Sequence, residues 1–174
     1  MTSILLRLGR WDKRILLALV MRRRPLLDLF MRRVTRLADW PVAVAITLTV
    51  ALGAPPEYQE AGVRMAWTLA LSHMGVEFLK RAFTRERPRL PTGMEWLVTV
   101  PDRFSFPSGH ATAGLSMALP LALALPLPLS LVILAAGMVI GISRCYLGVH
   151  YPGDVLAGWS LSGAVLAVGL LLGF

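Results

Sequence analysis

Beyond residue 38, the chain is a succession of apolar segments separated by short breaks that contain proline, glycine or charged residues. A helix needs about 20 apolar residues to cross a bilayer, so most of these segments approach the required length. The mean hydropathy of +0.64 also argues against an ordinary soluble domain of this size. We therefore predict an all-α fold, a multi-span transmembrane helical bundle with four or five crossings, at about 39–53, 62–83, 110–125, 130–147 and 152–174.

Residues 1–38 have a different character, because they hold ten of the eighteen Lys and Arg residues, interleaved with apolar residues at helical spacing. This pattern predicts one or two amphipathic helices in the membrane interface, broken or kinked at Pro25. A spanning helix here would bury three consecutive arginines, at about 2.5 to 3.5 kcal/mol each at the helix centre. We predict one domain over 1–174, with interfacial helices at 1–38 and a transmembrane catalytic bundle at 39–174.

The net charge of +8 could suggest nucleic acid, but the basic residues border apolar runs instead of forming a soluble basic face. We expect a bilayer with anionic lipids as the partner, and no nucleic acid. The single cysteine, Cys145, excludes an intramolecular disulfide and lacks the companions of a zinc site. The first apolar stretch, 15–21, is short and runs into arginines, so we expect no cleavable signal peptide.

Three separated fragments carry the side chains that a phosphate-transfer site needs. Such a site requires cations for the phosphoryl oxygens, a nucleophile, an acid for the leaving alcohol and a partner that orients the nucleophile. The fragments are Lys80 followed after six residues by Arg87-Pro88, then Pro107-Ser108-Gly109-His110, then Ser143-Arg144 followed after five residues by His150 and after three more by Asp154.

His150 is the expected nucleophile. Asp154 follows it by four residues, around a proline that suits the first turn of a helix. The carboxylate can then reach one imidazole nitrogen and leave the other free to attack phosphorus. No cysteine or aspartate in a better-activated setting competes for this role.

His110 follows Ser108 and Gly109 at a predicted helix start, where unpaired backbone amides and the helix dipole attract a phosphate. Gly109 lets the backbone approach closely, and Ser108 can add a hydroxyl donor. We expect His110 to lie beside the leaving oxygen, as general acid in the first step and base for water in the second.

Lys80, Arg87 and Arg144 come from separate parts of the sequence and suit the three equatorial oxygens of a phosphoryl group. We expect them to bind and stabilise that group, while Pro88 and Pro107 fix the loop geometry. Arginine at two of these places supplies planar, forked donors, so replacement by lysine should impair the site although the charge is kept.

These fragments resemble, in order and spacing, the three motifs of the type-2 phosphatidic acid phosphatases, also called lipid phosphate phosphatases, whose site is similar to that of vanadium haloperoxidases. No motif position departs from that pattern between Lys80 and Asp154. The resemblance implies a membrane phosphatase that needs no metal or cofactor and works through a phosphohistidine on His150. Phosphatidic acid, phosphatidylglycerol phosphate and polyprenyl mono- or diphosphates all remain open as the lipid phosphate substrate.

Two alternatives to hydrolysis also remain open. The first is a phosphotransferase that passes the phosphoryl group to an acceptor other than water. The second is a lipid-binding or transport protein that keeps the fold without turnover. Binding alone needs only the cations, so the presence of His110, His150 and Asp154 argues against this second alternative.

Several polar residues outside the main roles are open to interpretation. His73 and Glu77 lie four apart at membrane depth, where ionisable groups are rare. We favour a structural role, in which Glu77 pairs with Lys80 or Arg81, over a role in orienting Lys80 or contacting substrate. For Ser143, helix packing and phosphate contact are equally open. No carboxylate cluster has metal-ligand spacing. Contact with lipid headgroups is expected for Arg81, Arg85, Arg89 and Arg103.

The side of the membrane follows from charge. Five crossings would place the ends that bear Lys80, His110 and Arg144 on the same side as the N terminus. Seventeen of the eighteen Lys and Arg residues then share this side, and Arg64 is the exception. By the positive-inside rule we predict that the site faces the cytoplasm. The resemblance implies the cytoplasmic (inner) membrane of a bacterium, where many members of the family act on the outer face.

Overall fold

The computed structural model describes residues 2–100 and 102–173, with side chains described from residue 9. Within these ranges the chain is helical with no β-strand, and one isolated bridge joins Glu86 to Phe104. The expected all-α fold is confirmed. The helices are α1 (Thr2–Val20), α2 (Pro25–Thr35), α3 (Trp40–Leu48), α4 (Pro56–Phe83), α5 (Gly109–Ala124), α6 (Leu127–Tyr146) and α7 (Pro152–Leu171), with a 3₁₀ turn η1 (Arg36–Ala38) and a π turn η2 (Thr49–Gly53).

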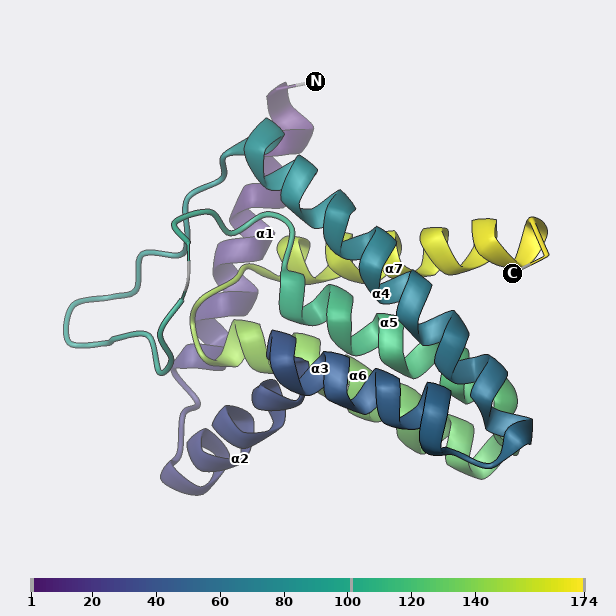
Figure 1. Cartoon of the computed structure of the whole chain (residues 1–174). Coiled ribbons are helices and arrows are strands. Elements are labelled where there is room, and N and C mark those ends of the chain that lie inside the picture. The colour runs from purple at the N-terminus through teal and green to yellow at the C-terminus, as the bar shows by residue number, and fades with distance from the viewer. Residues whose placement is uncertain (1, 101, 174) are drawn as a thin grey trace.

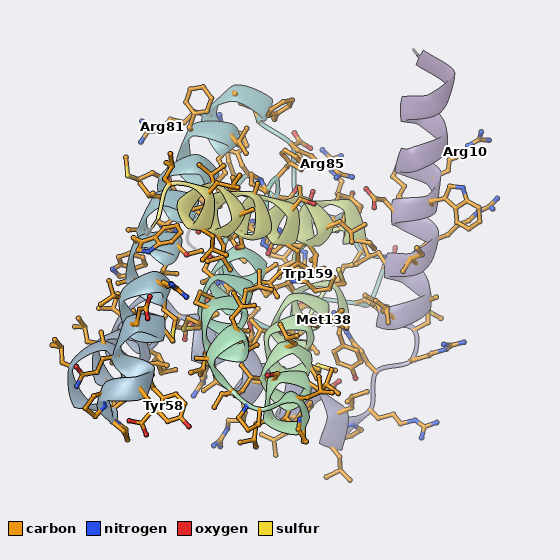
Figure 2. The ribbon with its side chains drawn as sticks, turned by 90° about the vertical axis from the view of Figure 1, so that its right-hand side faces the viewer. Arg10, Tyr58, Arg81, Arg85, Met138 and Trp159 are labelled. Atoms are coloured by element: carbon orange, nitrogen blue, oxygen red, sulfur yellow. The ribbon has the colours of Figure 1, made fainter. Side chains whose placement is uncertain are left out.

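The basic N-terminal segment forms two helices, as predicted, and Pro25 begins the second at a position where its missing N–H costs nothing. Helix α1 contacts α6 and α7. It lies at the edge of the bundle and runs crosswise to α7 in both views (Figures 1 and 2). This orientation suits a helix on the membrane surface, and its location in the interface stays a prediction.

Helix α5 forms the centre of the bundle, with α4, α6 and α7 packed around it (Figure 1). Glycines permit the closest approaches. A Cβ added to Gly137 on α6 would lie 2.6 Å from the Cβ of Ala118 on α5. A Cβ added to Gly158 on α7 would lie 2.8 Å from the Ser108 carbonyl oxygen. Small residues therefore bring the three backbones together, as is common where helices pack in membranes.

Buried hydroxyl groups fix the rotation of α5. The Ser116 Oγ lies 2.8 Å from that of Ser72 on α4 and 2.9 Å from that of Ser162 on α7. Ser162 also donates to the Thr112 carbonyl at 2.7 Å. This chain of hydrogen bonds joins three helices at a depth without bulk water, and it sets which way the first turn of α5 faces.

Helices α6 and α7 are each long and apolar enough to cross a membrane, and a third span results if the pair Pro25–Ala38 and Trp40–Gly53, bent by 60°, counts as one. Helix α5 has only 16 residues, and α4 carries charged residues near both ends. The number of crossings, expected to be four or five, stays a prediction.

Helix α4 begins six residues before the expected start at Gly62. Pro56 occupies the first turn and Glu57 follows it. Proline is favoured at the first helical position and a carboxylate stabilises the helix N terminus, so these two residues explain the earlier start.

The end of α4 and the starts of α5 and α7 lie at one end of the bundle, together with the end of α6 (Figure 1). The described residues of the long loop, 85–100 and 102–106, form no helix, as expected. Helix α6 ends at Tyr146, and Gly148 follows it with a φ of +85°, which is accessible to glycine. The reversal lets the His150 amide donate to the Arg144 carbonyl at 3.3 Å, which returns His150 to the end of α6.

Candidate active site

A cavity of about 990 Å³ lies at this end of the bundle, bordered by α2, α3, α4, α5 and the long loop. Six of the residues predicted from the motifs line it together, although they come from three separated fragments of the chain. They are Lys80, Arg87, Gly109, His110, Arg144 and His150.

His150 is buried at the base of the cavity with 2% of its surface exposed. Its Nδ1 lies 2.7 Å from the Ser105 carbonyl oxygen. Because a carbonyl only accepts, Nδ1 carries the proton and Nε2 is left with a lone pair. Nε2 lies 3.1 Å from Nη1 of Arg87, which donates to it. The nitrogen expected to attack phosphorus is therefore unprotonated and next to a cation that is predicted to bind phosphate.

The surroundings of His150 favour its neutral form. Burial lowers the pKa of His150 to about 4, and the neighbouring Arg144 and Arg87 act in the same direction. Asp154 raises the pKa of His150, but by less than burial and the two arginines lower it. The imidazole is thus a free base at neutral pH, as a nucleophile requires.

Asp154 is fully buried and lies 3.6 Å from Nδ1 of His150, which is an ion-pair distance when the ring is protonated. The prediction that Asp154 orients this ring needs adjustment, because the direct acceptor is the Ser105 carbonyl. The oxygens of Asp154 instead accept from the Tyr151 amide at 2.8 Å and from Nη1 of Arg85 at 2.7 Å.

Arg85 belongs to the site and not, as we expected, to the headgroup-contacting surface. It donates to Asp154 and, at 2.7 Å, to Asp12 on α1. Asp12 also accepts from the Gly153 amide at 2.8 Å. Burial opposes the charge on Arg85, yet the two carboxylates raise its pKa above the usual value. Figure 2 shows Arg85 between α1 and α7, whereas Arg10 and Arg81 point away from the bundle.

Asp102 holds two of the predicted phosphate-binding cations. Its Oδ2 lies 2.7 Å from Nζ of Lys80, and its Oδ1 lies 3.1 Å from Nη2 of Arg87. Its carbonyl oxygen accepts from Nε of Arg87 at 2.9 Å. Burial alone would raise the pKa of Asp102, but these cations lower it below the usual value. Asp102 therefore stays ionised and fixes the directions in which Lys80 and Arg87 donate.

His110 is paired with Asp39, whose Oδ1 lies 2.9 Å from Nε2 of His110. We expected the Asp39 side chain to cap the following helix. Asp39 does precede α3, but its side chain forms no capping hydrogen bond. A carboxylate only accepts, so Nε2 of His110 carries a proton and Nδ1 is the ring atom available to a substrate.

Arg144 is 3% exposed and projects from the end of α6 into the cavity. Its Nη1 donates to the hydroxyl of Thr35 on α2 at 2.9 Å. Its Nε is buried and has no hydrogen-bond partner. A buried guanidinium nitrogen without a partner is costly, and an anion in the cavity that Arg144 lines would stabilise its charge, which fits the predicted role of Arg144 as a phosphate ligand.

Ser108 precedes α5, and its Oγ accepts from the Ala111 amide at 3.4 Å as a helix cap. This fully buried hydroxyl was expected to donate to phosphate. Ser143 is also buried and donates to the Ile140 carbonyl at 2.6 Å, which favours its packing interpretation. The Pro88 carbonyl accepts from Trp96, and the Phe106–Pro107 peptide bond is cis.

His73 and Glu77 line the cavity from α4. Neither Glu77–Lys80 nor Glu77–Arg81 pairing is present, because Lys80 pairs with Asp102. The His73 ring stacks on Trp40 with centroids 4.9 Å apart. Among the described residues, no group of three or more His, Cys, Asp or Glu side chains is arranged to hold a metal ion.

Sequence reasoning missed Asp12, Asp39, Arg85 and Asp102 as parts of this site. One physical signal was available for Asp102, because buried cations need a counter-charge and Asp102 lies in the loop between the first two motifs. Asp12 and Asp39 lie before the first motif, and no local sequence pattern indicates that they belong to the same site as the motifs.

The sequence profile of the PAP2 superfamily matches residues 61–173, which is more than half of the chain. The chain belongs to the PAP2 superfamily. This match includes the three motifs and ends two residues after the last residue of α7. The residues of α1, α2 and α3 that contact the site, including Asp12, Thr35 and Asp39, lie outside it.

Known relatives agree with this assignment. Phosphatidylglycerophosphatase B of Bacillus subtilis is 31% identical over 176 residues, covering 94% of this chain and 80% of the relative. Decaprenylphosphoryl-5-phosphoribose phosphatase of Mycobacterium tuberculosis is 36% identical over 110 residues. That alignment covers 60% of each protein, so this chain spans less than two thirds of the mycobacterial enzyme.

Solved structures share the fold. The crystal structure of a transmembrane PAP2-type phosphatidylglycerolphosphate phosphatase from Bacillus subtilis superimposes with a TM-score of 0.78 at 26% identity, covering 95% of this chain and 86% of that one. Aquifex aeolicus LpxE superimposes with a TM-score of 0.79 at 24% identity, covering 91% and 93%. The predicted multi-span transmembrane bundle is thereby confirmed.

Proposed function

We propose that this chain is a lipid phosphate phosphatase that removes a terminal phosphate from a membrane lipid through a phosphohistidine intermediate. The observation that carries the proposal is the state of His150, a neutral buried imidazole whose Nε2 faces a cavity lined by Lys80, Arg87 and Arg144. A protein that only bound lipid phosphates would need the cations but not this nucleophile. Relatives named as phosphatases of lipid phosphates support the same reaction.

In the first step, Nε2 of His150 attacks phosphorus, and the bond between phosphorus and the lipid oxygen breaks. The Arg87 donor that contacts Nε2 in the free protein moves to a phosphoryl oxygen. Lys80 and Arg144 bind the other oxygens, where negative charge is spread in the transition state. The Ser105 carbonyl keeps the Nδ1 proton in place, and Asp154 stabilises the positive ring of the intermediate.

His110 supplies the proton that the departing lipid oxygen needs. Asp39 accepts from Nε2, so the proton is delivered from Nδ1 of the protonated ring. In the second step the neutral Nδ1 takes a proton from water, and the water oxygen attacks phosphorus. The bond between phosphorus and Nε2 of His150 then breaks, inorganic phosphate leaves, and both histidines return to their starting states.

The remaining site residues position these groups. Asp102 fixes Lys80 and Arg87, and Arg85 fixes Asp154. Gly109 places the N terminus of α5 at the cavity wall, where its backbone can approach the phosphate. We propose that catalysis needs no metal ion, because these cations and the helix terminus can neutralise the phosphoryl charge between them.

Phosphate release and covalent labelling test this proposal. Purified protein is expected to release phosphate from at least one of phosphatidic acid, phosphatidylglycerol phosphate and polyprenyl mono- or diphosphate, with chelator present. His150→Ala should leave less than about 1% of this activity and abolish acid-labile labelling by radioactive substrate, because no second nucleophile is available. Phosphate transfer to an added alcohol instead of release would indicate a phosphotransferase. Lipid movement between leaflets without release would indicate a transporter.

We also propose that the site faces the cytoplasm, with the basic N-terminal helices on the anionic inner surface of a bacterial cytoplasmic membrane. The charge distribution in the sequence supports this orientation, because seventeen of the eighteen Lys and Arg residues lie in segments expected on the side of the site, and Arg64 is the exception. Single cysteines at Thr92 and Gln59, in a Cys145→Ala background, can be labelled in intact cells with an impermeant reagent. Labelling at Gln59 alone is expected, and labelling at Thr92 alone would place the site outside.

A further inference from the structure

One face of the segment that joins α2 to α3 forms a wall of the cavity. Arg32, Thr35, Arg36 and Asp39 are spaced three, four and seven residues apart, which places them on one side of a helix. All four line the cavity. Thr35 accepts from Arg144, and Asp39 pairs with His110. The wall is therefore attached at two points to residues of the proposed reaction.

The two arginines on this wall are unpaired. Within the described part of the chain, the side chains of Arg32 and Arg36 form no hydrogen bond or ion pair. The other cations in the cavity have protein partners, since Lys80 and Arg87 contact Asp102 and Arg144 contacts Thr35. Five cations and three carboxylates line the cavity, so it retains a positive charge that the protein itself does not balance.

A single phosphoryl group does not account for this charge. Its three non-bridging oxygens are already served by Lys80, Arg87 and Arg144. Arg32 and Arg36 are additional guanidinium groups, each suited to forked contact with phosphate oxygens. Arg32 also borders the adjoining cavity of about 1370 Å³ beneath the long loop, so the arginine wall extends away from the reacting centre.

We infer that Arg32 and Arg36 form a second phosphate subsite, which binds a phosphate group of the substrate next to the one that is cleaved. The inference rests on the proposed function. It selects lipids that carry two neighbouring phosphate groups, such as a polyprenyl diphosphate or phosphatidylglycerol phosphate, over lipids with a single phosphate. Both kinds of lipid present a second anionic phosphate group, which is the group that the subsite recognises.

The test compares two variants that remove the same charge. Arg32→Gln/Arg36→Gln removes the subsite, and Arg22→Gln/Arg33→Gln removes two exposed arginines that do not line the cavity. Each is assayed on two pairs of substrates with identical tails: polyprenyl diphosphate against polyprenyl phosphate, and phosphatidylglycerol phosphate against phosphatidic acid. Inhibition by pyrophosphate and by orthophosphate provides a binding measurement without a lipid.

The subsite variant is expected to lose about tenfold in kcat/KM on the two-phosphate member of at least one pair and less than about twofold on its one-phosphate partner. Pyrophosphate inhibition should weaken while orthophosphate inhibition is unchanged. A response in the polyprenyl pair would identify the second phosphate of a diphosphate as the group bound in the subsite. A response in the glycerolipid pair would identify a phosphodiester. Equal losses within both pairs, or the same pattern in the control variant, would overturn the inference. A wild-type protein that releases phosphate from none of the four lipids would instead overturn the proposed function.

Discussion

Replacement of Asp39 by asparagine tests whether the proton for the leaving oxygen comes from His110. The change keeps the shape of the side chain and removes the negative charge 2.9 Å from Nε2 of His110. It leaves the hydrogen bonds of Lys80, Arg87, Arg144 and His150 in place, because none of them is made to Asp39. The expected effect is therefore confined to reactions in which the leaving oxygen needs a proton.

The size of the effect follows from the contact. A hydrogen bond to a charged group contributes about 1.5 to 3 kcal/mol and a neutral one about 0.5 to 1.5 kcal/mol. The Asp39 side chain is 47% exposed, so water screens its charge and the smaller difference applies. A loss of about 1 kcal/mol in stabilising the protonated ring corresponds to roughly a fivefold decrease in kcat/KM.

The assay compares phosphatidic acid with p-nitrophenyl phosphate in the same detergent. Asp39→Asn should lower kcat/KM about fivefold for the lipid, whose alkoxide must be protonated, and less than about twofold for the aryl ester, whose leaving group needs no proton. Glu77→Gln is the control, because Glu77 lines the same cavity without a hydrogen bond to His110. Equal losses on the two substrates in Asp39→Asn would refute the reasoning.

Three further outcomes follow from contacts in the site. Arg144→Lys should lower kcat/KM tenfold or more in a folded protein, because an ammonium cannot bind Thr35 and phosphate with separate planar donors; phosphate release checks this. NMR titration should find the His150 imidazole neutral as pH falls from 7 to 5 and protonated only near pH 4; a midpoint near 6.5 would contradict the structure. Asp12→Asn should lower kcat about threefold, measured against Asp28→Asn, because Arg85 then has one carboxylate partner.

The helices and the meeting of the motif residues at one cavity could be predicted, because their signals are local. The apolar segments determine where helices form, and Pro152 marks the start of α7 as expected. The spacing of His150 and Asp154 places them together whatever surrounds them. The start of α4 was missed because the apolar run begins later than the helix, whose first turn is defined by Pro56.

The partners of the reactive residues could not be predicted, because they are chosen by tertiary packing. Asp39 precedes His110 by 71 residues, and the direct acceptor for His150 is a backbone oxygen, which every residue has. Arg85 was assigned to the surface because its sequence neighbours are polar. Arg85 reaches Asp154 because the tertiary fold places the first turn of α7 next to it, and the sequence does not show this. The need to balance the charge of buried groups is the one criterion that could have narrowed the set of candidate partners.

The wall that carries the proposed subsite limits which fragments of the protein can keep a complete site. The superfamily match begins at residue 61, yet Asp12, Thr35 and Asp39 complete the surroundings of the motif residues from outside it. A fragment limited to the matched region would retain every motif side chain and lose the acceptors that hold Arg144, His110 and the start of α7. Chimeras that exchange the first 40 residues between relatives should therefore exchange substrate preference while the chemistry stays with the recipient.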